Sequence, residues 1–184
     1  MRKYLLIIIF AIASKSFGQN LIYYGNKKYT ATSIWTFKCE NYFWVGDLDV
    51  QIAKTNNGGY LKVAIEVPTN DLYIGSSVFI FLEDGTIITC SDKGIRDYLD
   101  KQSIALYVLT QAEMDKLKSV NISKIRFKIK TKYSKYNQDP GSFTAYNHFE
   151  VMNLNYKGLF DKNKTVEKEK DYYETSISVS ALYD

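Results

Sequence analysis

Residues 48–67 read LDVQIAKTNNGGYLKVAIEV, and this stretch decides the fold class. Apolar and polar side chains alternate on both sides of an Asn-Asn-Gly-Gly sequence, beginning with Leu48, Val50 and Ile52. Successive side chains of a strand point to opposite faces of a sheet, so such alternation indicates strands with one buried face. Asn and Gly are favoured in tight turns. The stretch therefore predicts a β-hairpin.

The strand pattern continues along the chain. Asp84-Gly85 predicts a second hairpin between strands at residues 77–83 and 86–91, because this pair suits the positive φ angles of a type I′ turn. In the last predicted strand, Ile177 and Val179 alternate with serines. The further strands are predicted near Leu21 and at residues 33–39, 104–109, 122–131, 143–152 and 173–183.

One helix and one long loop interrupt these strands. Thr110 and Glu113 match a capping box, and Met114 and Leu117 give the following turns an apolar side. This pattern predicts a short connecting helix that ends by Ser119. Residues 153–171 are rich in charge and poor in apolar side chains, so they are predicted to form an exposed loop.

Short strands separated by turns predict an all-β fold. We expect an antiparallel β-sandwich of about eight or nine strands with one short connecting helix. A closed β-barrel is the alternative. Residues 19–184 are long enough for one domain with its own core, so a single β-sandwich domain is expected there.

The first eighteen residues have the layout of a signal peptide. Arg2 and Lys3 precede ten apolar residues at positions 4–13, and the small residues Ser16 and Gly18 flank a predicted cleavage before Gln19. The apolar run is shorter than the roughly 20 residues of a membrane-spanning helix. We therefore expect an exported protein of the periplasm, the outer-membrane surface or the extracellular space, and not a transmembrane protein.

The net charge argues against nucleic acid as a partner. Three of the 24 Lys and Arg residues lie in residues 1–18, so residues 19–184 hold 21 basic and 20 acidic residues and a net charge near +1. A nucleic-acid-binding domain is usually more basic. No nucleic-acid partner is expected.

Residues 77–131 resemble a known pattern. The hairpin at Leu82, Glu83, Asp84 and Gly85 precedes a strand, a capped turn of helix and a basic strand. The residues that carry this second part are Tyr107, Leu109, Thr110, Glu113, Leu117, Ile122, Lys124, Ile125 and Arg126. The combination resembles small exported bacterial β-sandwich proteins of unknown function. The resemblance implies the fold and no catalytic residues.

The residues for catalysis or metal binding are sparse. His148 is the single histidine, and no Gly-x-Ser-x-Gly elbow accompanies it. Asp47 with Asp49 could offer oxygen ligands to calcium, and so could a group at Asp92, Asp97 and Asp100, but solvated surfaces explain both groups. We expect no catalytic site, no metal and no cofactor.

A local basic run is the strongest charge feature. Eight basic residues and no acid lie between Lys116 and Tyr136. On the strand at residues 122–131 the apolar side chains share one face, and the other face carries Lys124, Arg126, Lys128 and Lys130. This face could bind an envelope glycan, an anionic lipid or an acidic protein. Alternatively, the lysines protect an edge strand against pairing.

Aromatic and cysteine residues offer two further candidates. Trp44 and Tyr60 flank the first hairpin and are candidate platforms for a sugar ring, whereas Trp35 is expected in the core. Cys39 and Cys90 could form a disulfide in an oxidising compartment, or remain two buried thiols. The sequence leaves this choice open.

Together these features favour a binding function. We expect an exported, non-catalytic binding or interaction domain of the bacterial envelope, with a glycan, a lipid headgroup or a protein as its ligand. A structural envelope protein without a small ligand is the alternative, and a hydrolase acting on a glycan is third.

Overall fold

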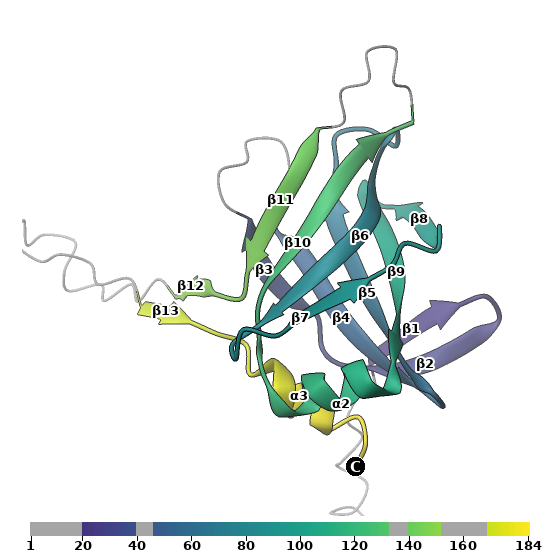
Figure 1. Ribbon diagram of the computed structural model, residues 1–184. Coiled ribbons are helices and arrows are strands. Elements are labelled where there is room, and N and C mark those ends of the chain that lie inside the picture. The colour runs from purple at the N-terminus through teal and green to yellow at the C-terminus, as the bar shows by residue number, and fades with distance from the viewer. Residues whose placement is uncertain (1–19, 40–45, 133–139, 152–168) are drawn as a thin grey trace, which may run out of the picture.

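The structure is a computed structural model that describes residues 20–39, 46–132, 140–151 and 169–184 (Figure 1). Most of these residues lie in antiparallel strands. In chain order the elements are β1 (Asn20–Tyr24), β2 (Lys27–Ala31), β3 (Trp35–Cys39), β4 (Leu48–Thr55), β5 (Gly58–Glu66), β6 (Leu72–Leu82), β7 (Ile87–Cys90), β8 (Arg96–Leu99), β9 (Gln102–Thr110), α2 (Gln111–Ser119), β10 (Ile122–Thr131), β11 (Gly141–Tyr146), β12 (Phe149–Val151), β13 (Glu169–Asp171) and α3 (Thr175–Ser180).

Within the described residues, eleven strands form one bent sheet. Its order is β7-β6-β10-β11-β3-β4-β5-β9-β8, and the β1–β2 hairpin joins it through β4. β11 and β3 pair only at Ala145 with Cys39 and at Tyr146 with Lys38. At this narrow connection the sheet bends, and β6, β7 and β10 lie across β4, β5 and β9 (Figure 1). The all-β sandwich is confirmed, and the barrel alternative is wrong because the edge strands β7 and β8 do not pair with each other.

One apolar core fills the space between the two halves of the sheet. Trp35 of β3 is buried in it, as expected. Phe37 of β3 and Phe127 of β10 belong to the same buried cluster. Met114 and Leu117 of α2 close one end of the core. The capping box between Thr110 and Glu113 and the end of this helix at Ser119 are also confirmed.

The first predicted hairpin is confirmed as β4 and β5. Its register runs from Asp49 with Ala64 to Thr55 with Gly58, so Gly58 and Gly59 belong to the strand and not to the loop. A Cβ atom on Gly58 would lie 2.1 Å from the carbonyl oxygen of Leu109. Glycine is therefore required here by the close approach of β9.

The second hairpin is confirmed as β6 and β7, but its turn differs from the predicted type I′. Gly85 has φ 84°. The positive-φ positions in the described residues do not include Asp84. Leu82 donates to the carbonyl oxygen of Thr86 at 2.9 Å and accepts from Gly85 N at 3.1 Å, which encloses a three-residue loop. Such loops place one residue in the left-handed region, and Gly85 occupies that position.

The predicted strand at residues 173–183 is wrong, because Thr175–Ser180 form the helix α3. Thr175 and Val179, four residues apart, are both buried, whereas Ile177 is 65% exposed. Asn121 Oδ1 accepts from the backbone N–H of Ser176 at 3.0 Å and from its hydroxyl at 2.8 Å. These tertiary contacts fix the first turn of the helix and outweigh the local alternation.

The predicted strand at residues 143–152 is interrupted at Asn147. Its amide Nδ2 donates to the carbonyl oxygen of Ile122 at 2.7 Å and to that of Tyr173 at 2.9 Å. β11 therefore ends before Asn147, and β12 begins after it. β12 pairs with β13, so residues 169–171 of the predicted loop at residues 153–171 form a strand instead. The rest of that loop lies within residues 152–168, outside the described part of the chain.

No helix within the described residues has both the length and the hydrophobicity needed to cross a lipid bilayer. Residues 1–18 lie outside the described part of the chain, so the structure does not test the predicted signal peptide.

Candidate functional site

The basic strand β10 lies in the interior of the sheet. It pairs with β6 on one side and with β11 on the other. Its apolar side chains, such as Phe127, are buried, so Lys124, Arg126, Lys128 and Lys130 share the outward surface. The explanation that these cations protect an edge strand is therefore wrong, because β10 has no free edge over most of its length.

Aromatic side chains flank these cations on the neighbouring strands. Phe81 of β6 and Tyr146 of β11 are the register partners of Lys124, whose Nζ lies 5.1 Å from the centre of the Phe81 ring and 5.7 Å from that of Tyr146. Phe79, which is 37% exposed, lies opposite Arg126. We call this outward surface the basic face: Lys124, Arg126, Lys128 and Lys130 of β10, with Tyr73, Phe79 and Phe81 of β6 and Tyr146 of β11.

The strands that form the basic face carry no carboxylate. Strands β6, β7, β10 and β11 contain no Asp or Glu. Between described residues, the ion pairs lie elsewhere and involve none of Lys124, Arg126 and Lys130. Lys116 and Lys118, which belong to the same basic run in the sequence, lie on α2, where Lys116 pairs with Asp84 of the β6–β7 turn and Lys118 pairs with Asp115. Lys124, Arg126 and Lys130 therefore retain their field toward solvent.

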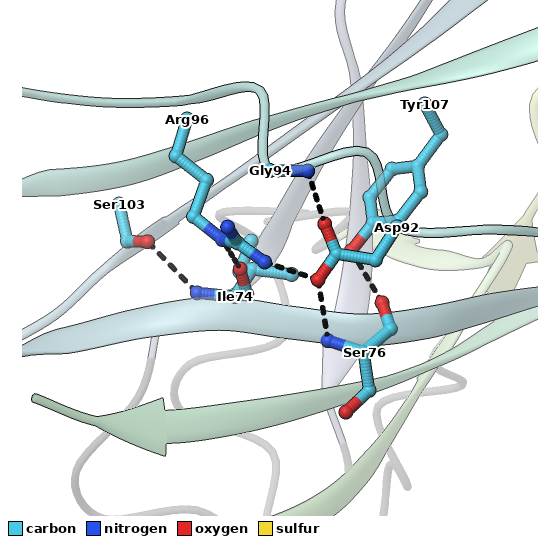
Figure 2. A network of polar contacts seen from close by, with 7 residues as sticks. All are labelled: Ile74, Ser76, Asp92, Gly94, Arg96, Ser103 and Tyr107. Atoms are coloured by element: carbon cyan, nitrogen blue, oxygen red, sulfur yellow. Dashed lines mark hydrogen bonds and ion pairs between the residues drawn. The ribbon is translucent and has the colours of Figure 1, made fainter.

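A polar network connects the two halves of the sheet beside the basic face (Figure 2). Residues Ser76–Val78 of β6 form a bulge opposite Phe127. Ser76 has φ 66°, a conformation that costs a non-glycine residue about 1–2 kcal/mol. Asp92 accepts the Ser76 backbone N–H at 2.9 Å, and Tyr107 of β9 donates its hydroxyl to the Ser76 carbonyl oxygen at 3.0 Å. Side-chain hydrogen bonds therefore take the place of backbone pairing at the bulge of β6. We call this contact between β6 and the segment from Asp92 to Tyr107 the seam.

Arg96 of β8 completes the network. Its Nε donates to the carbonyl oxygen of Ile74 at 2.9 Å, and its guanidinium pairs with Asp92. The guanidinium carbon also lies 5.0 Å from the centre of the Tyr73 ring. Burial, reinforced by the negative charge of Asp92, raises the pKa of the Tyr107 hydroxyl above its usual range, so this group stays a donor at neutral pH.

A hollow of about 460 Å³ opens at the end of the seam. Tyr73 joins it to the basic face, because this residue lines the hollow and is also the register partner of Lys130. A Cβ atom on Gly75 would lie 3.0 Å from both the Tyr73 ring and the Lys130 side chain, so both pack over a glycine. The polar and aromatic lining of the hollow includes Asn70, Tyr73, Arg96, Tyr98, Ser103 and Lys132.

Tyr60 does not belong to the basic face. Its ring packs edge-on against Tyr24 at 5.6 Å and Tyr29 at 5.2 Å, under the β1–β2 hairpin. This cluster covers a second, smaller core that contains Ile22. Burial and the hydrogen bond with Tyr29 raise the pKa of Tyr60. The half-buried Tyr60 ring therefore packs against the β1–β2 hairpin. Trp44, the other candidate platform, lies outside the described residues.

The disulfide between Cys39 and Cys90 is not formed, and both thiols are free. β3 and β7 stand four strand positions apart in the sheet, roughly 19 Å measured along the bent sheet at about 4.8 Å per strand. A bridge needs Cα atoms within about 7 Å. Burial raises the pKa of each thiol to about 12, so both are protonated and unreactive at neutral pH.

The other candidates do not assemble a reactive centre in the described residues. The ring of His148 lies 6.0 Å from that of Tyr146. Asp47 pairs with Lys38, and Asp49 accepts from the hydroxyl of Thr36 at 2.8 Å. Asp92 belongs to the seam network, and Asp97 accepts from the N–H of the next residue. In the described part of the chain, no three His, Cys, Asp or Glu side chains are arranged to hold a metal ion.

The hollow was missed at the sequence level. Its residues come from three separate segments, around residues 70–73, 96–103 and 132, and none of them carries a motif. The sequence patterns drew attention to two of them, Lys132 in the basic run and Asp97 as a candidate calcium ligand, and to neither as part of a pocket. Tyr73 and Tyr98 share no spacing that could have indicated a common site.

Comparison of the chain with protein-family models, with curated proteins and with solved structures found no match.

Proposed function

We propose that this protein is an exported, non-catalytic binding domain that holds an acidic ligand of the bacterial envelope on its basic face. The observation that carries the proposal is the place of β10 in the interior of the sheet. Lys124, Arg126 and Lys130 are not needed to protect an edge and have no ion-pair partner among the described residues, so these three cations are available for a ligand.

The backbone makes this surface rigid. Alternate residues of a strand repeat at about 6.6–6.8 Å, so β10 presents its charges in a fixed row. The ammonium group of Lys124 lies over the Phe81 ring, and the stem of Lys130 packs over Gly75. Such packing holds the ammonium groups at the surface and lowers the conformational entropy that binding must remove.

The chemistry selects for carboxylate, sulfate or phosphate groups flanked by apolar surface. Phe79 is 37% exposed and Ile87 of the adjacent edge strand is 53% exposed, so the face offers apolar contacts between its charges. A uronic-acid glycan, an anionic lipid headgroup and an acidic protein each supply these features. One variant that removes the cations tests all three partners. The binding probe, a polysaccharide or a lipid vesicle, then distinguishes a glycan from a lipid.

The test neutralises three cations of the face. We expect Lys124→Gln/Arg126→Gln/Lys130→Gln to weaken binding at least tenfold to an immobilised sulfated polysaccharide and to polygalacturonate, measured at low salt. Sedimentation with phosphatidylglycerol vesicles, compared with phosphatidylcholine vesicles, reports the lipid alternative. The matched control is Lys27→Gln/Lys28→Gln/Lys62→Gln, which removes the same charge from β2 and β5.

The control triple should keep wild-type binding. If both triples bind like wild type, or if both lose binding equally, the basic face is not the site. If the wild-type protein binds no polyanion and no vesicle, the structural role without a small ligand becomes the better explanation.

A further inference from the structure

We propose that the hollow beside Tyr73 is a sugar subsite, which receives one ring of an acidic glycan whose charged groups lie along β10. This inference rests on the proposed function, because it takes the glycan as the acidic ligand of the basic face. It adds a second, separately testable contact at the end of that face.

The lining of the hollow has the chemistry that sugars require. A sugar ring combines apolar faces with many hydroxyl groups, so its sites pair aromatic rings with planar polar side chains. Tyr98 is 38% exposed and offers a ring, and Asn70 and Arg96 offer planar groups. The volume of about 460 Å³ falls within the roughly 300–1,000 Å³ of small-ligand pockets.

Several polar groups of the hollow keep unused hydrogen-bonding capacity. Arg96 is fixed by Asp92 and Ile74 through Nε and one terminal nitrogen, which leaves Nη1 without a bond to any described residue. Ser103 is 2% exposed and accepts from the Ile74 N–H at 3.0 Å, so its own proton can be donated. A ligand with several hydroxyl groups can satisfy such a set.

The local charge favours a sugar ring over a phosphate in this position. Asp92 neutralises Arg96, and Asp97 lies in the same lining as Lys132. The hollow is therefore nearly neutral, in contrast to β10. A lipid phosphate would bind the cations of β10 and gain nothing from the hollow, whereas a glycan chain uses both surfaces through the shared residue Tyr73.

The experiment uses a glycan array with uronic-acid, sulfated and neutral oligosaccharides, followed by calorimetric titration with the tightest binder. We expect an acidic oligosaccharide to bind. Tyr98→Ala should weaken the affinity for this oligosaccharide roughly tenfold, because the variant loses the ring on which the sugar stacks. Tyr98→Phe keeps the ring and should lose less. Tyr23→Ala removes a tyrosine that is 68% exposed on β1 and should bind like wild type.

The outcomes separate this inference from the proposed function. If the β10 triple variant loses binding but Tyr98→Ala and a second variant, Asn70→Ala, both keep wild-type affinity, the hollow is not a subsite and the basic face remains. If no glycan binds while anionic vesicles do, the sugar inference is overturned. Melting curves of each variant, expected to match wild type, confirm that lost binding is not lost folding.

Discussion

The seam network makes a stability prediction centred on Asp92. This carboxylate accepts the backbone N–H of Ser76 at 2.9 Å and that of Gly94 at 2.8 Å, and it pairs with Arg96. Asp92→Ala would leave the Ser76 N–H, in its left-handed conformation, without its partner. It would also release the Arg96 side chain that links β8 to β6.

The expected loss can be worked out contact by contact. A partly buried hydrogen bond from Ser76 to a charged acceptor contributes about 1.5 kcal/mol. The exposed bond from Gly94 and the ion pair, whose side chains are 28% and 24% exposed, each contribute about 0.5 kcal/mol after solvent screening. The free energy of unfolding should therefore fall by about 2–3 kcal/mol. Asp92→Asn keeps an acceptor oxygen and should lose about 1 kcal/mol.

Urea unfolding and thermal melting measure this loss. For a chain of this length, about 2–3 kcal/mol corresponds to a melting temperature lower by roughly 5–10 °C. Asp97→Ala removes a nearby carboxylate that, among the described residues, accepts only from the N–H of Tyr98. It should change stability by less than about 0.5 kcal/mol. Equal melting temperatures for Asp92→Ala and Asp97→Ala would refute the argument that side chains hold the seam together.

Other substitutions and an alkaline titration test the rest of the structure. In urea unfolding, Gly58→Ala should lower the free energy of unfolding by about 3 kcal/mol or more, because φ is 140° and the new Cβ would lie 2.1 Å from the Leu109 carbonyl oxygen. Gly85→Ala, where φ is 84° and the space is open, should lower it by only about 1 kcal/mol. Phe127→Ala should cost about 3–5 kcal/mol by calorimetry, since the buried ring stacks on Phe143 at 5.7 Å. Burial raises the pKa of the Cys90 thiol from 9.0 to about 12, so the folded state keeps a proton that the unfolded chain releases. We therefore expect this thiol to leave the free energy of unfolding unchanged below about pH 9 and to lower it as the pH rises toward 12, in measurements with reductant present. The decrease should be less steep in Cys90→Ala.

Local sequence information predicted much of the fold. Both hairpins and the capped helix depend on residues within a few positions of one another, such as Thr110 and Glu113, so their sequence patterns are sufficient. α3 was missed because the alternation of Ile177 and Val179 is a local pattern, while the contacts that form this helix come from Asn121, more than fifty residues away. The bend of the sheet between β11 and β3 is also a long-range property.

The chain by itself determined that β-strands dominate and that four cations share one side of the strand at residues 122–131. These are consequences of side-chain alternation, which every strand obeys. Only the tertiary structure decided that this strand lies inside the sheet, that Cys39 and Cys90 stand apart, and that Tyr73, Arg96 and Tyr98 meet at one hollow. The physical reason is that strand order and the bend of the sheet depend on which distant strands pair, and no local pattern encodes that choice.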